Sequence, residues 1–338
     1  MRKPLLSVII PVYNSENYIN ECLTSLIQQI SDLSIEVIAV NDGSTDSSLE
    51  ILRQFENSYS YVHVFSQENK GVSSARNYAL RNSTGRYLMF LDSDDYFFLD
   101  CLGEIRKIIS KRDFDCILFG LKTYRNGQME VLGELPSESF SGARSDMYAW
   151  MMKLETPYGG YVAGKVVNRN VLFGREGLSI SFDENKDMLE DEWFWLHVAN
   201  KCDSIFFLNK ALYCYRYSNA GISRSHSPER NKKEVFMKIK AYEFLKKCCP
   251  EVAPQALARV VLTIGGFIRR YYVLQDKQEL KKIRKLWKEY PGITLLRLNE
   301  IPIFLKIASL LCDIAMILHI PVKAIKPFAR LLSKGMDF

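Results

Sequence analysis

Four polar residues, Asp92-Ser93-Asp94-Asp95, follow directly after an apolar run in the first third of the sequence. Carboxylates this close to one another repel, and a bound cation is the usual way in which proteins offset that repulsion. Mg²⁺ and Mn²⁺ take oxygen ligands from one or two carboxylates and complete their coordination with substrate phosphates. Because alternate residues of an extended turn face the same side, we expect Asp92 and Asp94 to hold Mn²⁺ or Mg²⁺. The simpler alternative is an acidic turn that begins a helix.

A second carboxylate, Asp42, ends another apolar run and precedes Gly43, which permits close approach of a ligand to the backbone. Its side chain could accept a hydrogen bond from the ring N–H of a base such as uracil. Capping of the helix predicted over 44–55 is its alternative role, although Asp46 could serve there instead. The sequence has no Walker loop and no Gly-x-Gly-x-x-Gly after the first strand, so a nucleotide would be held by carboxylates and metal.

The residues around these positions predict alternating strands and helices. Between the strands, apolar residues recur at helical spacing, and Asn14 or Ser15 is expected to cap the first helix. Strand–helix–strand units with short links form right-handed crossovers in a parallel sheet, which binds ligands at the carboxyl ends of its strands. Asp42 and Asp92 both stand at such ends. The predicted strands are the apolar runs at 5–12, 35–40, 61–65 and 87–91.

After residue 115 the pattern changes. A strand at 116–121 leads into a hairpin with Asn126-Gly127 at its turn, and an irregular stretch follows to about residue 188. A helix at 192–199 and two strands, 205–208 and 212–215, complete the first predicted domain. We place that domain at residues 1–228 and a region of helices at residues 229–338.

Four motifs carry a family resemblance: SVIIPVYNSENYI, VNDGSTDSS, ENKGVSSARN and YLMFLDSDD. In this order and spacing they resemble the inverting family 2 glycosyltransferases of bacteria. The resemblance implies an α/β GT-A fold, which is Rossmann-like with a mostly parallel central sheet, and an enzyme that uses nucleotide sugars. It covers the first 95 residues, weakens through 100–225 and does not reach the C-terminal helices.

By this resemblance, Pro11, Tyr13 and Glu16 line a nucleoside pocket in which Asp42 reads the base. Asp92 contacts the ribose or the metal, and Asp94 coordinates the metal beneath the diphosphate. Arg76 is also expected to pair with the acidic cluster, and Asp95 to begin the next helix. The implied nucleotide-binding set is Pro11, Tyr13, Glu16, Asp42, Lys70, Gly71, Arg76, Asp92 and Ser93.

The same resemblance assigns the chemistry of transfer to Glu190-Asp191, the acidic pair before Glu192, Trp193 and Phe194. Inversion needs a base that takes the acceptor's proton, and we expect Asp191 to be that base and Glu190 to orient the acceptor. Carboxylates at a helix start also complement the helix dipole, which is the alternative role. Low-ranked candidates for the diphosphate or acceptor are Lys165, Arg216 and Arg224, and His226 could be a third metal ligand.

Charge divides the sequence. Residues 1–228 carry 23 Lys or Arg and 29 Asp or Glu, whereas residues 229–338 carry 22 and 10. The apolar run at 301–322, interrupted by Lys306 and Asp313, precedes further basic residues and predicts an interfacial helix on an anionic membrane surface. Packing on the catalytic domain or on a second subunit of a homo-oligomer is the alternative. The eight scattered cysteines favour a reducing compartment, so we expect a cytoplasmic protein on the inner face of the cell membrane, without a nucleic-acid partner.

Together these features predict a metal-dependent, inverting enzyme that moves one sugar from a nucleotide-diphosphate donor, UDP-linked, to an acceptor. The expected acceptor is a lipid-linked or growing glycan of a bacterial lipopolysaccharide, capsule or exopolysaccharide. Processive synthases of the resembled family carry Gln-x-x-Arg-Trp, which this sequence lacks, so transfer of a single sugar is expected. Two alternatives stay open, a nucleotidyltransferase that makes sugar nucleotides and an inactive carbohydrate-binding scaffold of the same fold.

Overall fold

The computed structural model describes residues 3–30, 34–125, 128–133, 135–153, 157–185, 189–216, 228–273, 278, 281–282, 285 and 288–290. The chain divides into two compact units. The first unit contains Met1–Met147 and Tyr158–Ser223, and the second contains Tyr148–Pro157 and Arg224–Phe338.

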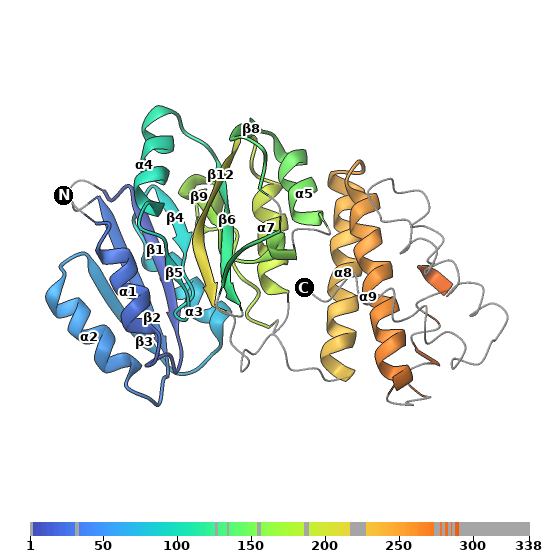
Figure 1. Ribbon diagram of the computed structural model, residues 1–338, viewed down its shortest axis with the longest axis horizontal. Coiled ribbons are helices and arrows are strands. Elements are labelled where there is room, and N and C mark those ends of the chain that lie inside the picture. The colour runs from blue at the N-terminus through green and yellow to red at the C-terminus, as the bar shows by residue number, and fades with distance from the viewer. Residues whose placement is uncertain are drawn as a thin grey trace. The chain divides into compact units, whose positions relative to one another are not determined.

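The first unit is built on one large sheet (Figure 1). Its strands are β1 (Leu6–Val12), β2 (Ile35–Asp42), β3 (Val62–Gln67), β4 (Tyr87–Phe90), β5 (Tyr96–Phe97), β6 (Cys116–Arg125), β7 (Gln128–Leu132), β8 (Phe140–Gly142), β9 (Lys165–Asn168) and β12 (Ile205–Arg216). They are ordered β3-β2-β1-β4-β9-β6-β12-β5, with β7 paired to β6 and β8 to β12. β10 (Phe173–Gly174) and β11 (Gly177–Leu178) form a separate small hairpin.

Most of the long strands run in the same direction. β1 pairs in parallel with β2 and β4, and β2 pairs in parallel with β3. β9 is antiparallel to both β4 and β6, so β6 and its parallel neighbour β12 run in the direction of β1. The mostly parallel α/β sheet that the sequence predicts is therefore confirmed. β9 is an antiparallel strand in its middle, and the short strands β5, β7 and β8 also pair antiparallel.

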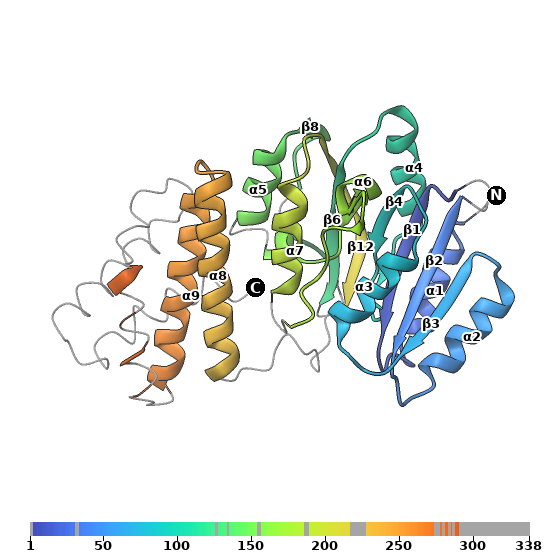
Figure 2. The ribbon, with the colours of Figure 1, turned by 180° about the vertical axis from the view of Figure 1, so that it is seen from behind.

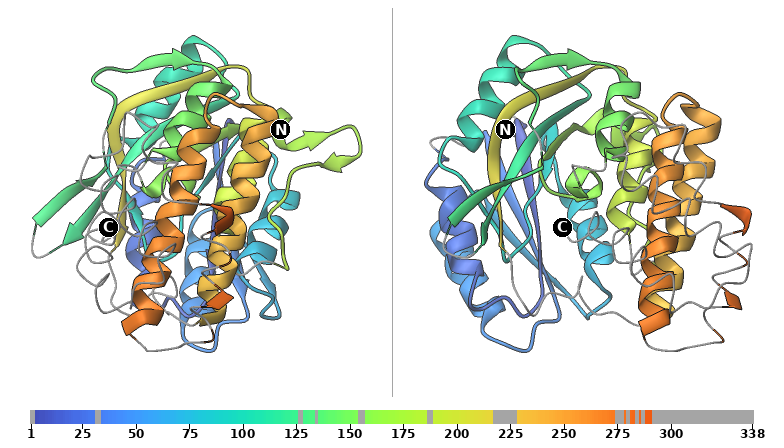
Figure 3. Two further views of the ribbon diagram at one scale, coloured as in Figure 1. Left: turned by 90° about the vertical axis from the view of Figure 1, so that its right-hand side faces the viewer. Right: turned by 45° about the vertical axis from the view of Figure 1, so that its right-hand side comes forward.

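Helices cover both faces of this sheet. α1 and α2 lie on one face, and α3 and α7 lie on the other (Figures 1, 2 and 3). All residues of β1 and β2 are buried between these layers, which explains their continuous apolar runs. The helices of this part of the chain are α1 (Ile19–Ile27), α2 (Ser48–Ser58), α3 (Val72–Asn82), α4 (Cys101–Lys111), α5 (Arg144–Met152), the 3₁₀ turn η1 (Pro157–Gly160), α6 (Arg169–Leu172) and α7 (Glu190–Ala199).

Two predicted helix starts are wrong, for one reason. α1 begins at Ile19, and neither predicted cap serves it. Asn14 takes a left-handed conformation, with φ +47°, and the Ser15 hydroxyl contacts Tyr13 and Ser93 instead. The N–H of Thr45 donates to the Asn14 side chain at 2.8 Å, and the N–H of Ser47 donates to Glu16. Because residues 44–47 bond to the loop after β1, α2 begins only at Ser48. The loops after β1 and β2 thus bond to each other, an interaction between residues about 30 positions apart that local patterns do not reveal.

The stretch to residue 188, predicted as irregular, contains β9 in the middle of the sheet. The two strands predicted at 205–208 and 212–215 are one strand, β12, with register shifts between Phe207 and Tyr213. Asn126-Gly127 lies outside the described residues, and the strands that flank it, β6 and β7, pair antiparallel as expected for a hairpin.

The second unit contains α8 (Pro228–Cys248) and α9 (Ala253–Val273), which pack side by side. Leu245 and Val260 are among their buried apolar residues. None of the helices in the described part of the chain is long and apolar enough to cross a bilayer. The predicted interfacial helix at 301–322 and the basic residues after it lie outside the described residues.

Candidate active site

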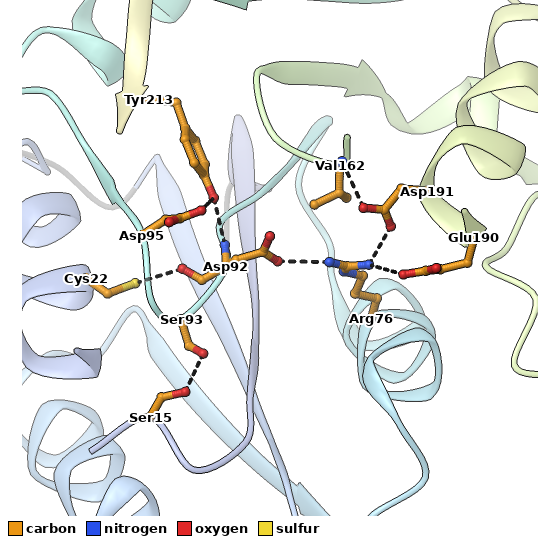
Figure 4. A network of polar contacts seen from close by, with 10 residues as sticks. All are labelled: Ser15, Cys22, Arg76, Asp92, Ser93, Asp95, Val162, Glu190, Asp191 and Tyr213. Carbon is orange, nitrogen blue, oxygen red and sulfur yellow. Dashed lines mark hydrogen bonds and ion pairs between the residues drawn. The ribbon is translucent and has the colours of Figure 1, made fainter. Parts of the chain in front are cut away.

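The triplet Asp92-Ser93-Asp94 leaves the carboxyl end of β4 in a turn that the surrounding residues hold in place. The backbone N–H of Asp92 donates to the hydroxyl of Tyr213 at 3.2 Å. Ser93 is buried, and its hydroxyl lies 2.7 Å from that of Ser15 in the loop after β1 (Figure 4). Asp94 follows these anchored residues and precedes the next strand, and it is exposed. The turn therefore presents the Asp94 carboxylate to solvent from a fixed backbone.

Asp95 does not begin a helix, which corrects the prediction. Its carboxylate is buried, accepts the hydroxyl hydrogen of Tyr213 at 2.6 Å, and accepts the backbone N–H of Arg216 at 2.8 Å. The chain continues into β5, and α4 begins only at Cys101. Burial, with the charges of Asp94 and then Asp92, raises the pKa of Asp95 well above its usual range. Asp95 thus joins the turn after β4 to the end of β12.

Arg76, on α3, connects the carboxylates of the two sequence motifs (Figure 4). Its guanidinium donates to Asp92 Oδ1 at 2.9 Å and to Asp191 Oδ1 at 2.6 Å, and it lies 3.7 Å from Glu190 Oε1. The Arg76 side chain is buried, so these ion pairs are shielded from bulk water. Loss of a carboxylate partner would leave the buried guanidinium with less charge compensation. Burial by itself would lower the pKa of Arg76, but its three acidic partners raise that pKa, so the guanidinium stays protonated. The ion pair predicted between Arg76 and the acidic cluster is present.

Asp191 lies in the first turn of α7, after Leu189, which has a left-handed backbone with φ +55°. Arg76 contacts one carboxylate oxygen, and the backbone N–H of Val162 donates to the other, Oδ2, at 3.1 Å. Burial raises the pKa of Asp191 to about 7; Arg76 opposes this shift, and Glu190 adds to it. A carboxylate with this pKa can accept a proton from a hydroxyl near neutral pH, as a general base does.

Asp42 ends β2 and is buried, and its carboxylate accepts three hydrogen bonds from the chain itself. Gln67 Nε2 and the backbone N–H of Lys70 donate to Oδ1 at 2.7 and 2.9 Å, and the N–H of Gly71 donates to Oδ2 at 2.8 Å. Gly71 has φ +88°, a conformation that favours glycine, and directly precedes α3. Asp42 therefore holds the loop that leads into the helix bearing Arg76, in addition to any contact with a base.

The other residues of the predicted nucleoside pocket lie at the end of β1 and in the loop that follows it. Pro11 is buried within β1, and Tyr13 is exposed. Glu16 Oε2 accepts the backbone N–H of Ser47 at 3.0 Å, which fixes this loop against the start of α2. Pro11, Asp42 and Asp92 thus come from adjacent strands β1, β2 and β4, at the ends where a parallel sheet binds its ligands.

The basic residues predicted to contact the diphosphate or the acceptor differ in their exposure and in their partners. Lys165 is fully buried, and its ammonium donates to backbone carbonyls, so it does not face solvent. Arg216, at the end of β12, forms an ion pair with Glu21 at 2.5 Å and lies over the ring of Tyr96 at 4.9 Å. Its charge also partly offsets the rise that burial causes in the pKa of Asp94. Arg224 and His226 lie outside the described residues.

The carboxylates at the end of β4 suit a hard divalent cation. Desolvation of its carboxyl by the surrounding protein, followed by the charge of Asp92, raises the pKa of Asp94, and a bound cation would offset both effects. Asp92 shares one oxygen with Arg76 and retains lone pairs for a further ligand. The described residues contain no group of three or more His, Cys, Asp or Glu side chains that could hold a metal alone. The donor set therefore fits Mg²⁺ or Mn²⁺ completed by substrate phosphates.

Two residues of this site had no signal in the sequence. Val162 takes part only through its backbone N–H, which no residue pattern specifies. Tyr161, the residue before it, is 39% exposed, and its ring lies 5.7 Å from that of Tyr215 on β12. Aromatic residues of this kind also occur as ordinary core residues, so their type alone does not mark them.

Known proteins resemble this chain in sequence and in fold. Residues 7–156 match the family described as glycosyl transferase family 2. Over 263 residues the chain is 30% identical to a Bacillus subtilis protein provisionally named the teichuronic acid biosynthesis glycosyltransferase TuaG, covering 76% of this chain and 98% of that one. It is also 30% identical over 230 residues to glycosyltransferase GlyA of Streptococcus pneumoniae, covering 65% of this chain and 31% of GlyA.

Among solved structures, residues 1–349 of S. aureus TarS in complex with UDP-GlcNAc superimpose with a TM-score of 0.66. The sequences are 21% identical, and the match covers 98% of this chain and 91% of that one, which shows a common fold.

The fold is thus that of the GT-A transferases. The chain belongs to glycosyl transferase family 2 and is a glycosyltransferase. This assignment sets aside the nucleotidyltransferase alternative. The chain spans less than two thirds of the length of the first curated relatives that it matches, down to 31% of GlyA.

Proposed function

We propose that this glycosyltransferase transfers one sugar from a UDP-sugar to a glycan acceptor, with inversion and with Mn²⁺ or Mg²⁺ as cofactor. One observation carries the proposal: Arg76 joins Asp92, at the predicted donor side, to Asp191, at the predicted acceptor side. A carboxylate that holds the leaving group and a carboxylate that activates the nucleophile must lie in one site. The two ion pairs of Arg76, which keep Asp92 and Asp191 close together, support these roles.

The donor side of the proposed site consists of the strand ends of β1, β2 and β4. Asp42 and the loop after β1 would bind the nucleoside, and Asp92 and Asp94 would hold the cation. When bound, the cation neutralises charge on the leaving diphosphate. The UDP-GlcNAc in the complex of TarS supports a UDP-linked donor.

On the acceptor side, Asp191 would remove the proton from the attacking hydroxyl while that oxygen bonds to the anomeric carbon and the bond to the diphosphate breaks. Attack from the face opposite the diphosphate inverts the anomeric configuration. Glu190, 3.7 Å from the same guanidinium, would orient the acceptor. Arg76 would stay protonated and keep Asp191 at a fixed position relative to Asp92.

The acceptor is proposed to be a lipid-linked or growing glycan of the bacterial cell surface. The provisional name of TuaG, which refers to teichuronic acid biosynthesis, supports this class. The first unit would carry catalysis, and the basic residues of 229–338 would hold the enzyme at the anionic inner face of the cell membrane or in a homo-oligomer. An active enzyme is favoured over an inactive scaffold because Asp92, Asp94 and Asp191 are all present.

A donor screen tests the proposal. Unfolding temperatures are measured for the full chain with UDP-, GDP- and dTDP-sugars, each with MnCl₂ or EDTA, because a ligand that binds the folded state raises that temperature. The preferred sugar nucleotide then enters a turnover assay, in which nucleotide release is followed with water as the acceptor and with added oligosaccharides. A UDP-sugar is expected to give the largest shift, only with Mn²⁺. A larger shift with GDP- or dTDP-sugars would contradict the UDP assignment.

Replacing Tyr161 by alanine is expected to weaken acceptor binding selectively. Its exposed ring, paired with Tyr215, offers an apolar face to a sugar one residue from the amide that contacts Asp191. Loss of one aromatic contact should raise the oligosaccharide concentration for half-maximal turnover by about 3- to 10-fold. Turnover with water should stay unchanged. Phe140→Ala is the matched control, because Phe140 is similarly exposed and paired with an aromatic ring, that of Phe207, near the opposite end of β12. Equal effects of both variants would contradict the acceptor role.

A further inference from the structure

A lysine inside the first unit has no place in the proposed chemistry. Lys165, the first residue of β9, is fully buried, and its ammonium donates to the carbonyl oxygens of Tyr161 at 2.6 Å and Ala163 at 3.3 Å. It also lies 5.2 Å over the ring of Trp195. A buried amine is costly unless its hydrogen bonds are satisfied, so a fully buried lysine in a four-residue strand requires an explanation.

The two carbonyls that bind the ammonium flank a single residue, Val162. The N–H of Val162 donates to Asp191 Oδ2 at 3.1 Å. Lys165 therefore binds the peptide group that contains the Val162 N–H, and also the peptide group between Ala163 and Gly164. A short chain of contacts thus runs from β9 to the Asp191 carboxylate. It consists of the Lys165 ammonium, the two carbonyls and the Val162 amide.

Gly164 allows the chain to fold back in this way. It has φ +75°, and a Cβ at this position would lie 2.7 Å from the backbone oxygen of Phe119. Only glycine fits this turn, which returns the carbonyls of residues 161 and 163 to the side chain of residue 165. Phe119 N donates to the Gly164 carbonyl at 2.9 Å, so β6 fixes the other side of the turn.

Lys165 also contacts the helix that bears the base. Trp195 lies on α7, one turn after Asp191, and is fully buried. The ammonium over its ring therefore sets the loop at 161–163 against α7. Burial lowers the pKa of Lys165 to about 7, while Cys116 and Asp191 oppose this shift, which is consistent with an amine enclosed by the protein.

We propose that Lys165 is a positioning residue for Asp191. By binding the carbonyls of Tyr161 and Ala163, it keeps the Val162 N–H directed at Oδ2, while Arg76 holds Oδ1, so that the carboxylate keeps the orientation in which it receives a proton. It does not contact the diphosphate or the acceptor. This inference rests on the proposed function, in which Asp191 is the base.

Lys165→Met, of similar length and without hydrogen-bond donors, tests the inference in the full chain. We expect UDP affinity with MnCl₂ to stay within about twofold and turnover to fall about 100-fold, the cost of a displaced catalytic group. Since the Val162 N–H lowers the pKa of Asp191, its loss should move the acid limb of the pH–rate profile to higher pH. Lys165→Gln, which keeps a donor, should recover part of the rate. Lys122→Met is the matched control, because Lys122 also lies 5.2 Å over an aromatic ring, that of Phe98.

A spectroscopic readout separates this inference from the proposed function. With ¹⁵N-valine labelling, the Val162 amide should shift as Asp191 titrates in the wild-type protein, and the shift should be absent in Asp191→Asn and strongly reduced in Lys165→Met. A Lys165→Met protein with wild-type turnover, pH limb and amide titration would overturn the positioning role. If Lys165→Met weakens UDP binding but turns over the bound donor at the wild-type rate, Lys165 contacts the donor and the positioning role is wrong. If Lys165→Met does not fold, Lys165→Leu, which also lacks a donor, replaces it in every readout with the same expected and contradicting results.

Failure of the base assignment gives a different result. In that case Asp191→Asn turns over normally, but the Val162 amide still reports whether Lys165 holds the loop.

Discussion

Asp191→Asn is expected to lower turnover by about 10²- to 10⁴-fold and to leave UDP binding unchanged. Asparagine preserves the shape of the side chain and can accept a hydrogen bond from Val162, but it cannot take a proton from the acceptor. Asp191 contacts Arg76 and not the proposed nucleoside pocket, so the donor site should keep its Asp92–Arg76 ion pair. Turnover at saturating donor and calorimetric titration with UDP and MnCl₂ measure the two effects.

The wild-type pH profile belongs to the same prediction. Burial raises the pKa of Asp191 to about 7 in the folded protein, so the base is protonated and inactive below that pH. Turnover should therefore rise as pH increases through about 7 and then level off, and the Asn variant should lose this limb. Asp203→Asn is the matched control, since Asp203 pairs with Arg144 on the surface and its side chain is 87% exposed. A variant at position 191 with the rate and pH limb of the wild type would refute the assignment.

Asp94→Ala is expected to abolish the dependence of UDP binding on Mn²⁺. Asp94 is the exposed residue of the triplet. Its pKa is raised by desolvation from the surrounding protein and by repulsion from Asp92, both of which a cation would offset. Changes to groups that only orient a metal ligand cost about 10- to 100-fold in affinity, so loss of a ligand should cost at least about 100-fold. Calorimetric titration with UDP, in MnCl₂ and in EDTA, compares wild type and variant.

Asp100→Asn provides the control for this experiment, because Asp100 is an exposed aspartate that precedes α4 and lies a few residues away. It should bind UDP as the wild type does under both conditions. If Asp94→Ala binds UDP with MnCl₂ as tightly as the wild type, the metal lies elsewhere. If the wild type itself binds equally well in EDTA, donor binding does not need a metal.

Local sequence patterns predicted the donor half of the site. Asp42 and Asp92 each follow a buried apolar strand, and the carboxyl ends of neighbouring parallel strands meet at one edge of a sheet. The position of a strand and the residue at which it ends both depend on residues close in the chain. The spacing of apolar and polar residues was therefore sufficient to predict them. The helix boundaries failed where a distant loop bound the capping residue, as Thr45 binds Asn14.

The acceptor half needed the tertiary structure. Family resemblance indicated Asp191, but its partners Arg76 and Val162 are 115 and 29 positions away in the chain. β9 has four residues and no usable periodicity, and its sheet position follows from its pairing with β4 and β6 on either side. Without that strand, Lys165 reads as a cation for the diphosphate or the acceptor, whereas it is buried beneath the loop that contacts Asp191.

The sequence by itself therefore determined the βαβ order, the family and the carboxylates at the strand ends. Each of these depends on residues adjacent in the chain, whose apolar or polar character sets local structure. The tertiary structure alone decided that Arg76 joins Asp92 to Asp191, that Asp95 binds Tyr213, and that Lys165 faces inward. Those contacts link residues far apart in the chain. Which residues meet depends on how the strands and helices pack, and the order of apolar and polar residues along the sequence does not specify this.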